Sequence, residues 1–290
     1  MDYIYHILII INIYIIIAVS TNLLVGLTKL LSLGQAAFYG IGAYLAAFGL
    51  IVLNLPLLPL VVFVMLCTAI LSFSISLPSL RLKDDYFVLS TLGFQLIVFS
   101  LLYNWISVTK GPYGISGITA PVLFPGVEIN GIIPFLITSM FFSSLTIFVF
   151  YKLIHSPFGR ILKALRDDEI AVLSLGRNVA AFKIYAFVIS SSFLSISGIL
   201  YAAYVTYIDP TSFNLDESIF ILSAVIIGGT GNIKGPVSGA IFVVLLPELL
   251  RFLGLPDTVA ANLRQIIYGL IIIILMRFRP QGLLGVYKLK

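Results

Sequence analysis

The chain has 290 residues, of which 60% are hydrophobic and 10% are charged. Soluble domains are about half apolar and about a quarter charged, so this composition excludes an ordinary soluble domain and indicates a polytopic membrane protein. The net charge of +5 is interpreted through topology, because basic residues of membrane proteins concentrate on the cytoplasmic side.

A series of apolar segments is expected to cross the membrane, because a spanning helix needs about 20 mostly apolar residues. In chain order they cover residues 4–24, 32–53, 58–80, 87–105, 131–151, 185–207, 219–230, 236–250 and 263–278. The seventh is short enough to be re-entrant. The first has no Lys or Arg before Lys29, so it lacks the basic region of a signal peptide and is interpreted as a retained span. We expect an all-α polytopic membrane protein with a single transmembrane domain over residues 1–290.

The basic residues predict how these spans are oriented. If the loop 152–183 and the carboxyl-terminal tail face the cytoplasm, 14 of the 17 Lys and Arg residues lie on the cytoplasmic side. The opposite orientation inverts the ratio, which the positive-inside tendency disfavours. We therefore expect the loop and the carboxyl terminus in the cytoplasm and the amino terminus outside.

Uncharged polar side chains mark the second and fourth spans. Gln35 and Tyr39 are four residues apart on one face of the second span, as are Thr91 and Gln95 on the fourth. Such pairs are typical of a path for a zwitterionic solute. They are equally typical of hydrogen bonds between helices, which are worth about 1 kcal/mol or less in a membrane. Both interpretations stay open.

The segment 156–178, SPFGRILKALRDDEIAVLSLGRN, carries seven charged residues in an otherwise apolar chain. Ser156 followed by Pro157 is typical of a helix start, because the Ser oxygen accepts an unpaired backbone N–H and Pro needs no partner at the first helical position. A first short helix is therefore predicted over 157–166. Its apolar side comprises Phe158, Ile161, Leu162 and Leu165.

A second short helix is predicted to begin at three acidic residues, Asp167, Asp168 and Glu169, which are favourable at the positive end of a helix. Gly176 is placed to end this helix in a left-handed conformation. Four apolar residues lie between these ends: Ile170, Val172, Leu173 and Leu175. A solvated connector does not need them, and anionic lipid repels three successive acids. We therefore expect this loop to dock on a protein.

Small residues form a stripe on the sixth span. Ser191, Ser195, Gly198 and Ala202 follow one face of the expected helix. In lipid, small residues allow two helices to approach closely, because association there relies on van der Waals packing. The stripe therefore predicts a helix contact, which lies either within this chain or with another subunit.

Catalytic and metal sites are not indicated by the sequence. The single cysteine, Cys67, lies in an apolar run, and His6 and His155 lack partners at ligand spacing. No G-x-x-x-x-G-K-[ST] sequence is present to hold nucleotide phosphates. The cores of the candidate spans contain no Asp, Glu, Lys or Arg, which disfavours a proton-coupled pump. A channel or transporter driven by a soluble partner remains; an ion-coupled secondary transporter and a structural membrane protein are the alternatives.

Six blocks of the sequence recur together in one known family. In chain order they are LSLGQAAFYGIGAY (31–44), LRLKDDYFVLSTLGF (80–94), TKGPYGISGI (109–118), SPFGR…LRDDEIAVLSLGRN (156–178), GGTGNIKGPVSGA (228–240) and RFRPQGLLG (277–285). Over about residues 20–286 the chain thereby resembles the permease subunits of bacterial and archaeal ABC importers for branched-chain amino acids.

The resemblance implies a fold, a location and a set of partners. The fold is a type II importer-like permease with about 8–10 transmembrane helices and two repeat-related halves, in the prokaryotic inner membrane. The implied partners are a second homologous permease subunit, two ABC ATPase subunits that bind ATP and Mg, an extracytoplasmic solute-binding protein and membrane lipid, with no nucleic acid. The chain itself is expected to be no enzyme and to bind no metal or other cofactor.

In such importers a cytoplasmic loop of the permease fits a groove on the ATPase, and this role falls here on 156–178. The residues matched to it are Ser156, Pro157, Phe158, Gly159, Arg160, Arg166, Asp167, Asp168, Glu169, Ala171 and Gly176. The loop is similar to the EAA-type coupling signature, although its Glu and Gly are seven residues apart rather than six. Gln35 stands where many members have His. Close relatives carry urea or short-chain amides, which remain the alternative substrates.

Overall fold

The computed structural model describes residues 2–80, 82, 84–119, 121–124, 127–129, 131–251, 263, 266, 267, 269–271, 273, 274, 277 and 281–285. The longer helices are α1 (Asp2–Thr28), α2 (Gln35–Ile51), α3 (Leu57–Ser79), α4 (Asp84–Asn104), α6 (Ile132–His155), α9 (Val179–Val205), α10 (Leu215–Gly228) and α11 (Lys234–Arg251). The shorter ones are α5 (Ile106–Thr109), α7 (Pro157–Asp167), α8 (Glu169–Ser174), and the 3₁₀ turns η1 (Gly111–Tyr113) and η2 (Pro210–Phe213).

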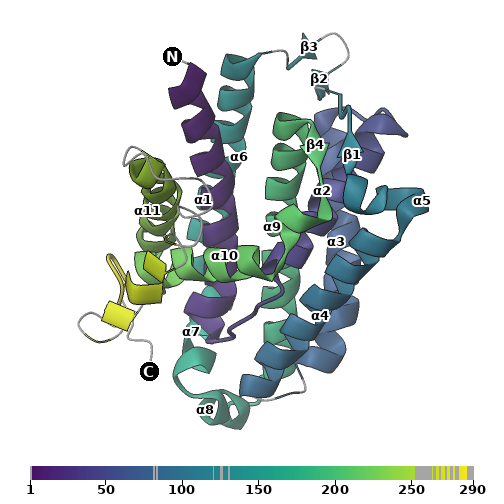
Figure 1. Cartoon of the computed structure of the whole chain (residues 1–290). Helices are drawn as coiled ribbons and strands as arrows, with labels where there is room; N and C mark the ends of the chain where they lie inside the picture. Colours follow the sequence, from purple (N-terminus) through teal and green to yellow (C-terminus); the bar gives the residue numbers. More distant parts are fainter. Residues whose placement is uncertain are drawn as a thin grey trace.

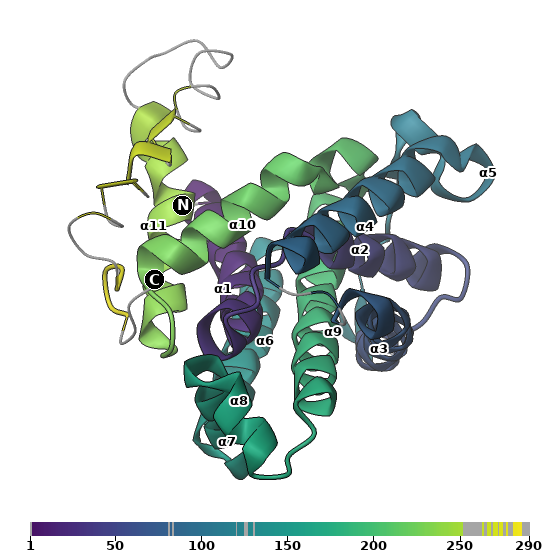
Figure 2. The same ribbon diagram turned by 90° about the horizontal axis from the view of Figure 1, so that it is seen from below.

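Two long helices, α1 and α9, lie side by side at the centre of the bundle (Figures 1 and 2). Helix α1 packs against α6, α10 and α11, whereas α9 packs against α2 and α3. Helices α7 and α8 lie together at one end, opposite the amino-terminal end of α1 (Figure 1). The largest apolar core joins α1, α2 and α9, so these helices form the frame that positions the rest.

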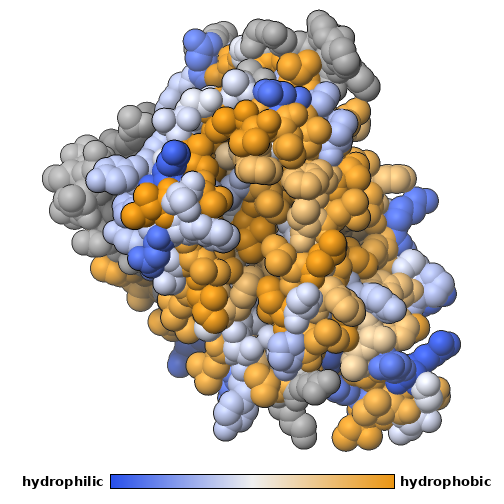
Figure 3. Space-filling model, turned by 90° about the vertical axis from the view of Figure 1, so that its right-hand side faces the viewer, coloured by the Kyte–Doolittle hydropathy of each residue, from blue (hydrophilic) through white to orange (hydrophobic). Residues whose placement is uncertain are grey.

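Five helices in the described part of the chain are long and apolar enough to cross a membrane: α1, α3, α4, α6 and α9. They coincide with the predicted spans that begin at residues 4, 58, 87, 131 and 185. On the face formed by α3, α4 and α5, apolar side chains cover a broad surface (Figure 3), as suits contact with lipid. The prediction of an all-α polytopic membrane protein is confirmed.

The other four predicted spans do not correspond to long spanning helices in the described part of the chain. Helix α2 has 17 residues, Gln35–Ile51, and is therefore shorter than the predicted span 32–53. The short segment predicted over 219–230 belongs to α10, which has only 14 residues. The segment 236–250 lies within α11. The span predicted over 263–278 lies outside the described residues, apart from isolated positions.

A short segment that contains strand β4 and the 3₁₀ turn η2 connects α9 to α10. Strand β4 (Tyr207–Ile208) pairs antiparallel with β1 (Ile115–Ser116), which ties the glycine-rich segment 109–117 to this end of α9. Asn214 then caps α10, because its side-chain oxygen accepts the Glu217 N–H at 3.1 Å. Strands β2 (Val122–Phe124) and β3 (Val127–Glu128) form a separate antiparallel pair.

The contact between α2 and α9 is close because small residues line it. An added Cβ at Gly42 of α2 would lie 2.6 Å from the Cα of Ser195 on α9. Ser191, Ser195 and Ala202 of the predicted stripe are buried, and Gly198 lies against the α2 backbone at Tyr39 and Ala43. At Ser195 and Gly198 the stripe therefore packs against α2 of the same chain, which agrees with the within-chain interpretation.

Candidate functional site

The segment 156–178 folds into two short helices, and its first cap is the one that the sequence predicts. Ser156 has an extended conformation, and its Oγ accepts the Gly159 N–H at 3.2 Å. Pro157 occupies the first helical position of α7. Because both residues satisfy the requirements of a helix start, α7 begins at Pro157 as expected.

The second helix, α8, begins at Glu169, two residues after the predicted start at Asp167. Asp168 is the N-cap of α8: its Oδ1 accepts the N–H groups of Ile170 and Ala171 at 2.9 and 3.0 Å. Asp167 does not belong to the first turn of α8, because it is the last residue of α7. The cap therefore assigns different roles to adjacent acids, and only Asp168 and Glu169 lie at the positive end of α8.

Gly176 ends α8 in the predicted way. Its φ is +72°, in the left-handed region that glycine adopts without a steric penalty, and its N–H donates to the carbonyl of Leu173 at 2.9 Å. Asn178 then caps α9, since its side-chain oxygen accepts the Ala181 N–H at 3.1 Å. Three consecutive helices are thus separated by residues that define each end.

A small apolar cluster joins the three helices α7, α8 and α9. Its buried members are Leu165 of α7, Val172 of α8 and Val179 of α9, and the half-buried Ile161 and Phe182 pack against them. Leu162 is fully buried in the main core, on the same side of α7. The α7–α8 pair, which we call the coupling unit (residues 157–174), is therefore packed against the frame.

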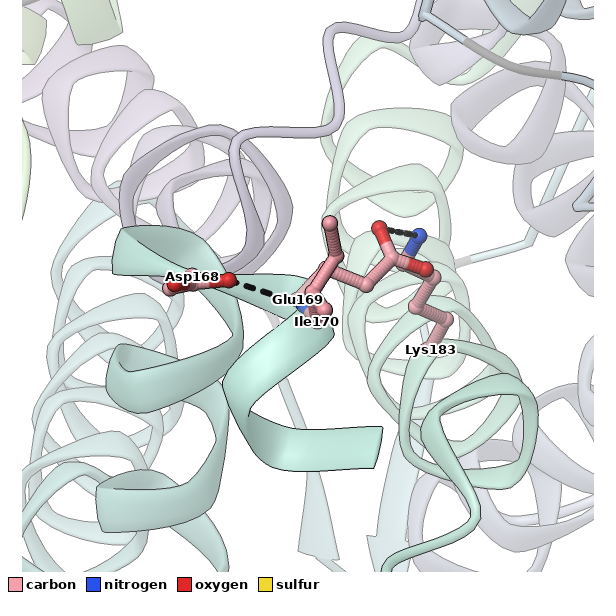
Figure 4. A network of polar contacts seen from close by, with 4 residues as sticks. All are labelled: Asp168, Glu169, Ile170 and Lys183. Atoms are coloured by element: carbon pink, nitrogen blue, oxygen red, sulfur yellow. Dashed lines mark hydrogen bonds and ion pairs between the residues drawn. The ribbon is translucent and has the colours of Figure 1, made fainter. Parts of the chain in front are cut away.

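Two polar contacts hold the coupling unit to the central helices. Lys183 Nζ of α9 lies 2.7 Å from Glu169 Oε2 of α8 in an ion pair (Figure 4). The Arg166 guanidinium of α7 donates to the carbonyl oxygen of Gly26 near the end of α1. Each short helix thus has its own polar link, α8 to α9 and α7 to α1.

The opposite side of α8, together with Leu175 directly after the helix, is apolar and exposed. Ile170, Leu173 and Leu175 are 75%, 53% and 79% exposed, respectively. The predicted coupling residues Pro157, Arg160, Asp167 and Ala171 are also exposed, whereas Phe158 is half-buried and Gly159 is buried against the end of α6. Burying a Leu or Ile side chain contributes about 1.5–3 kcal/mol, so this surface is suited to bind another protein.

The four polar residues of the second and fourth spans lie inside the bundle. Gln95 Nε2 donates to the Phe213 carbonyl at 2.7 Å, and Thr91 Oγ1 accepts the Leu33 N–H at 3.1 Å. Tyr39 packs its ring against Phe213 at a centroid distance of 5.0 Å. The buried amide of Gln35 makes no hydrogen bond to the described residues. Three of these side chains therefore hold neighbouring elements together.

Sequence reasoning missed a carboxylate inside the bundle. Tyr14 lies at the middle of the 27-residue α1, and its hydroxyl donates to Glu217 Oε1 of α10 at 2.6 Å. The predicted span 219–230 excluded Glu217 because it began two residues later. The spacing of Asn214 and Glu217 is typical of a helix start and was the signal that places Glu217 within the helix.

Comparison with known proteins places the chain in a family. Residues 3–276 match the family model described as "Branched-chain amino acid transport system / permease component". The chain is similar to the high-affinity branched-chain amino acid transport system permease protein LivM of Salmonella typhimurium, at 36% identity over 94% of this chain and 68% of that protein. LivM of Escherichia coli K12 is 35% identical over the same shares of the two chains.

A more distant relative is the probable branched-chain amino acid transport permease protein LivM of Methanocaldococcus jannaschii, which is 30% identical over 72% of this chain and 62% of its own length. No solved structure matches the chain. The family model extends from the first turn of α1 beyond the end of α11 and includes the whole coupling unit. The chain therefore belongs to the family of permease components of branched-chain amino acid transport systems.

Proposed function

We propose that this chain is the permease of an ABC importer for branched-chain amino acids, and that its coupling unit transmits the movement of the ATPase subunits to the membrane helices. The observation that carries the proposal is the exposed apolar side of α8 on a unit that is linked to both central helices. We take branched-chain amino acids as the transported solute because the LivM relatives are named as permeases for these amino acids.

The two polar links define the proposed route of coupling. ATP binding closes the two ATPase subunits, and α8 moves with the surface on which it is docked. Because Glu169 is paired with Lys183 and Arg166 donates to Gly26, the displacement reaches α9 and α1 together. These two helices form the centre of the bundle. The displacement therefore moves the helices around the translocation path as rigid bodies.

The proposed complex contains four kinds of subunit. This chain pairs with a second homologous permease, and two ATPase subunits bind ATP and Mg below the coupling units. A solute-binding protein delivers the amino acid from outside, next to the end of the molecule that carries α5 and the β1–β4 pair. In this arrangement the coupling unit and the carboxyl terminus face the cytoplasm, in agreement with the positive-inside tendency.

The proposed docking surface is tested by replacing its exposed apolar side chains with charged ones. We expect the double substitution Ile170→Lys and Leu175→Lys to remove the ATPase subunits from the purified complex and to lower ATP-driven leucine uptake more than about tenfold, since loss of a central apolar contact costs about 2 kcal/mol or more. The control is Tyr113→Lys, which places the same charge on an 84% exposed aromatic at the other end of the molecule. Retention of the ATPase subunits by the double variant would refute the docking assignment.

A further inference from the structure

A groove of about 680 Å³ lies beside the end of α6. One wall is a stripe on α6 formed by Ser144, Ile147, Phe148, Tyr151, Ile154 and His155. The other boundaries are Lys163 of α7 and the turn of residues 231–234 that leads into α11. The spacing of the α6 residues places them on one helix face, so the groove runs along the helix axis.

The groove is basic at one end and apolar along its length. Lys163 and Lys234 approach it from two different elements, and His155 ends α6 beside them. No Asp or Glu is among the described residues that line it. Lys152 adds a further positive charge, 5.8 Å from the centre of the Phe148 ring. A ligand with a negatively charged end and an apolar body matches this distribution.

The position of the groove along α6 matches the boundary of a bilayer. Helix α6 has 24 residues; at 1.5 Å per residue it is about 36 Å long, longer than a hydrocarbon core of about 30 Å. The basic end is therefore at the level of the lipid headgroups. Phe148 precedes His155 by two turns, so the apolar wall lies about 10 Å deeper, among the acyl chains.

We propose that this groove binds an anionic phospholipid of the leaflet next to the coupling unit. Lys163 and Lys234 hold the headgroup, and one acyl chain lies along Ile147, Phe148 and Ile154. Basic pockets between transmembrane helices recognise anionic headgroups in this way. The apolar wall continues along α6 into exposed side chains, Met140 and Phe141, that face the same hydrocarbon layer.

The bound lipid connects two parts of the chain that lie on different helices. Lys163 belongs to the coupling unit, and Lys234 begins α11. A shared headgroup phosphate accepts hydrogen bonds from both ammonium groups and thereby holds α7 to the turn before α11. Anionic lipid is therefore expected to order the coupling unit without contact to α8, independently of whether α8 docks on an ATPase.

Native mass spectrometry of the full chain, released from nanodiscs that contain phosphatidylglycerol or phosphatidylcholine alone, tests the site. We expect the double substitution Lys163→Gln and Lys234→Gln to lower retention of phosphatidylglycerol about tenfold or more, because each basic residue contributes about 1 kcal/mol to anionic lipid. Retention of phosphatidylcholine should not change. The matched control is Lys110→Gln with Arg160→Gln, which removes the same charge outside the groove and should leave phosphatidylglycerol bound.

Equal loss in the control and the double variant, or no loss in either, would overturn the proposal. A second measurement identifies the occupant in the assembled transporter. A photoreactive benzoylphenylalanine in place of Phe148 should form a phospholipid adduct in native membranes. An adduct with a polypeptide would instead assign the groove to a protein partner and contradict the lipid site. In addition, Ser144→Phe, which fills the apolar part, should lower retention of both lipids.

Discussion

The α2–α9 contact and the coupling unit differ in how closely they are packed. Between α2 and α9 the two backbones are so close that an added Cβ at Gly42 has no room, so this contact leaves no space for a partner. In the coupling unit one side is anchored by Val172 and the ion pair of Glu169, whereas the other side of α8 leaves Ile170 and Leu175 exposed. The frame is closed by packing, and the coupling unit is held by a few contacts that leave a surface for a partner.

The largest effect on stability is expected at the close contact between α2 and α9. Gly42→Ala should lower the thermal unfolding midpoint in detergent, because overpacking costs about 1–3 kcal/mol and the backbone of α9 cannot move aside as a side chain would. Gly93→Ala is the matched control, since Gly93 of α4 has open space around its Cβ position. The control should be neutral or slightly stabilising, as Ala favours helix. Equal midpoints for the two variants would contradict the close contact.

A polar contact between α1 and α10 should have an effect of similar magnitude. Tyr14→Phe removes the donor to Glu217 and leaves a carboxylate without that partner. Hydrogen bonds to charged groups contribute about 1.5–3 kcal/mol. A double-mutant cycle of Tyr14→Phe and Glu217→Ala, followed by unfolding in detergent, should therefore give a coupling free energy in this range. A coupling free energy near zero would show that the two side chains do not interact.

Removing the N-cap of α8 tests whether this helix can be destabilised without an effect on the central helices. Asp168→Ala should destabilise α8 by about 0.5–2 kcal/mol, because the N–H groups of Ile170 and Ala171 lose their acceptor. Hydrogen exchange should then increase in residues 169–176 and remain unchanged in α2 and α9. Asp168→Asn keeps a good cap and removes the charge, so it should restore protection. If Asn fails to restore it, charge rather than capping determines the start of α8.

The smallest effect on stability is expected at the ion pair between α8 and α9. Exposed pairs contribute about 0–1 kcal/mol, so Lys183→Met should change the unfolding midpoint little. Its effect on transport should be larger, because the link from α8 to α9 is lost while the docking surface stays intact. ATPase subunits should remain bound, and ATP-driven uptake should fall. The exchange Glu169→Lys with Lys183→Glu should recover part of the uptake; failure to do so would argue against this route of coupling.

Local signals in the sequence predicted the coupling unit well. Ser156 and Pro157 define the start of α7, and Gly176 defines the end of α8, because each residue acts on backbone groups within four positions of itself. Asp167 was assigned to the wrong helix, since the adjacent Asp167 and Asp168 can both cap a helix and the sequence does not say which one does.

Contacts between distant segments were beyond the reach of the sequence. The small-residue stripe predicted a helix contact, but which helix packs on it, α2 at Ser195 and Gly198, depends on the packing of the whole bundle. The partnership of Tyr14 and Glu217 joins residues 203 positions apart, which no local pattern specifies. The same holds for the link from Arg166 to Gly26, where a charged loop residue bonds to the end of the first helix.

The central claim is that the exposed side of α8 lies against an ATPase subunit. The most direct test is a photoreactive benzoylphenylalanine in place of Leu175, in the transporter assembled in native membranes, with the same substitution at Tyr113 as the control. We predict an adduct between position 175 and a P-loop ATPase, and none from position 113. An adduct from position 175 with lipid alone, or a purified chain without ATPase subunits that still transports solute in liposomes under an ion gradient, would contradict the account.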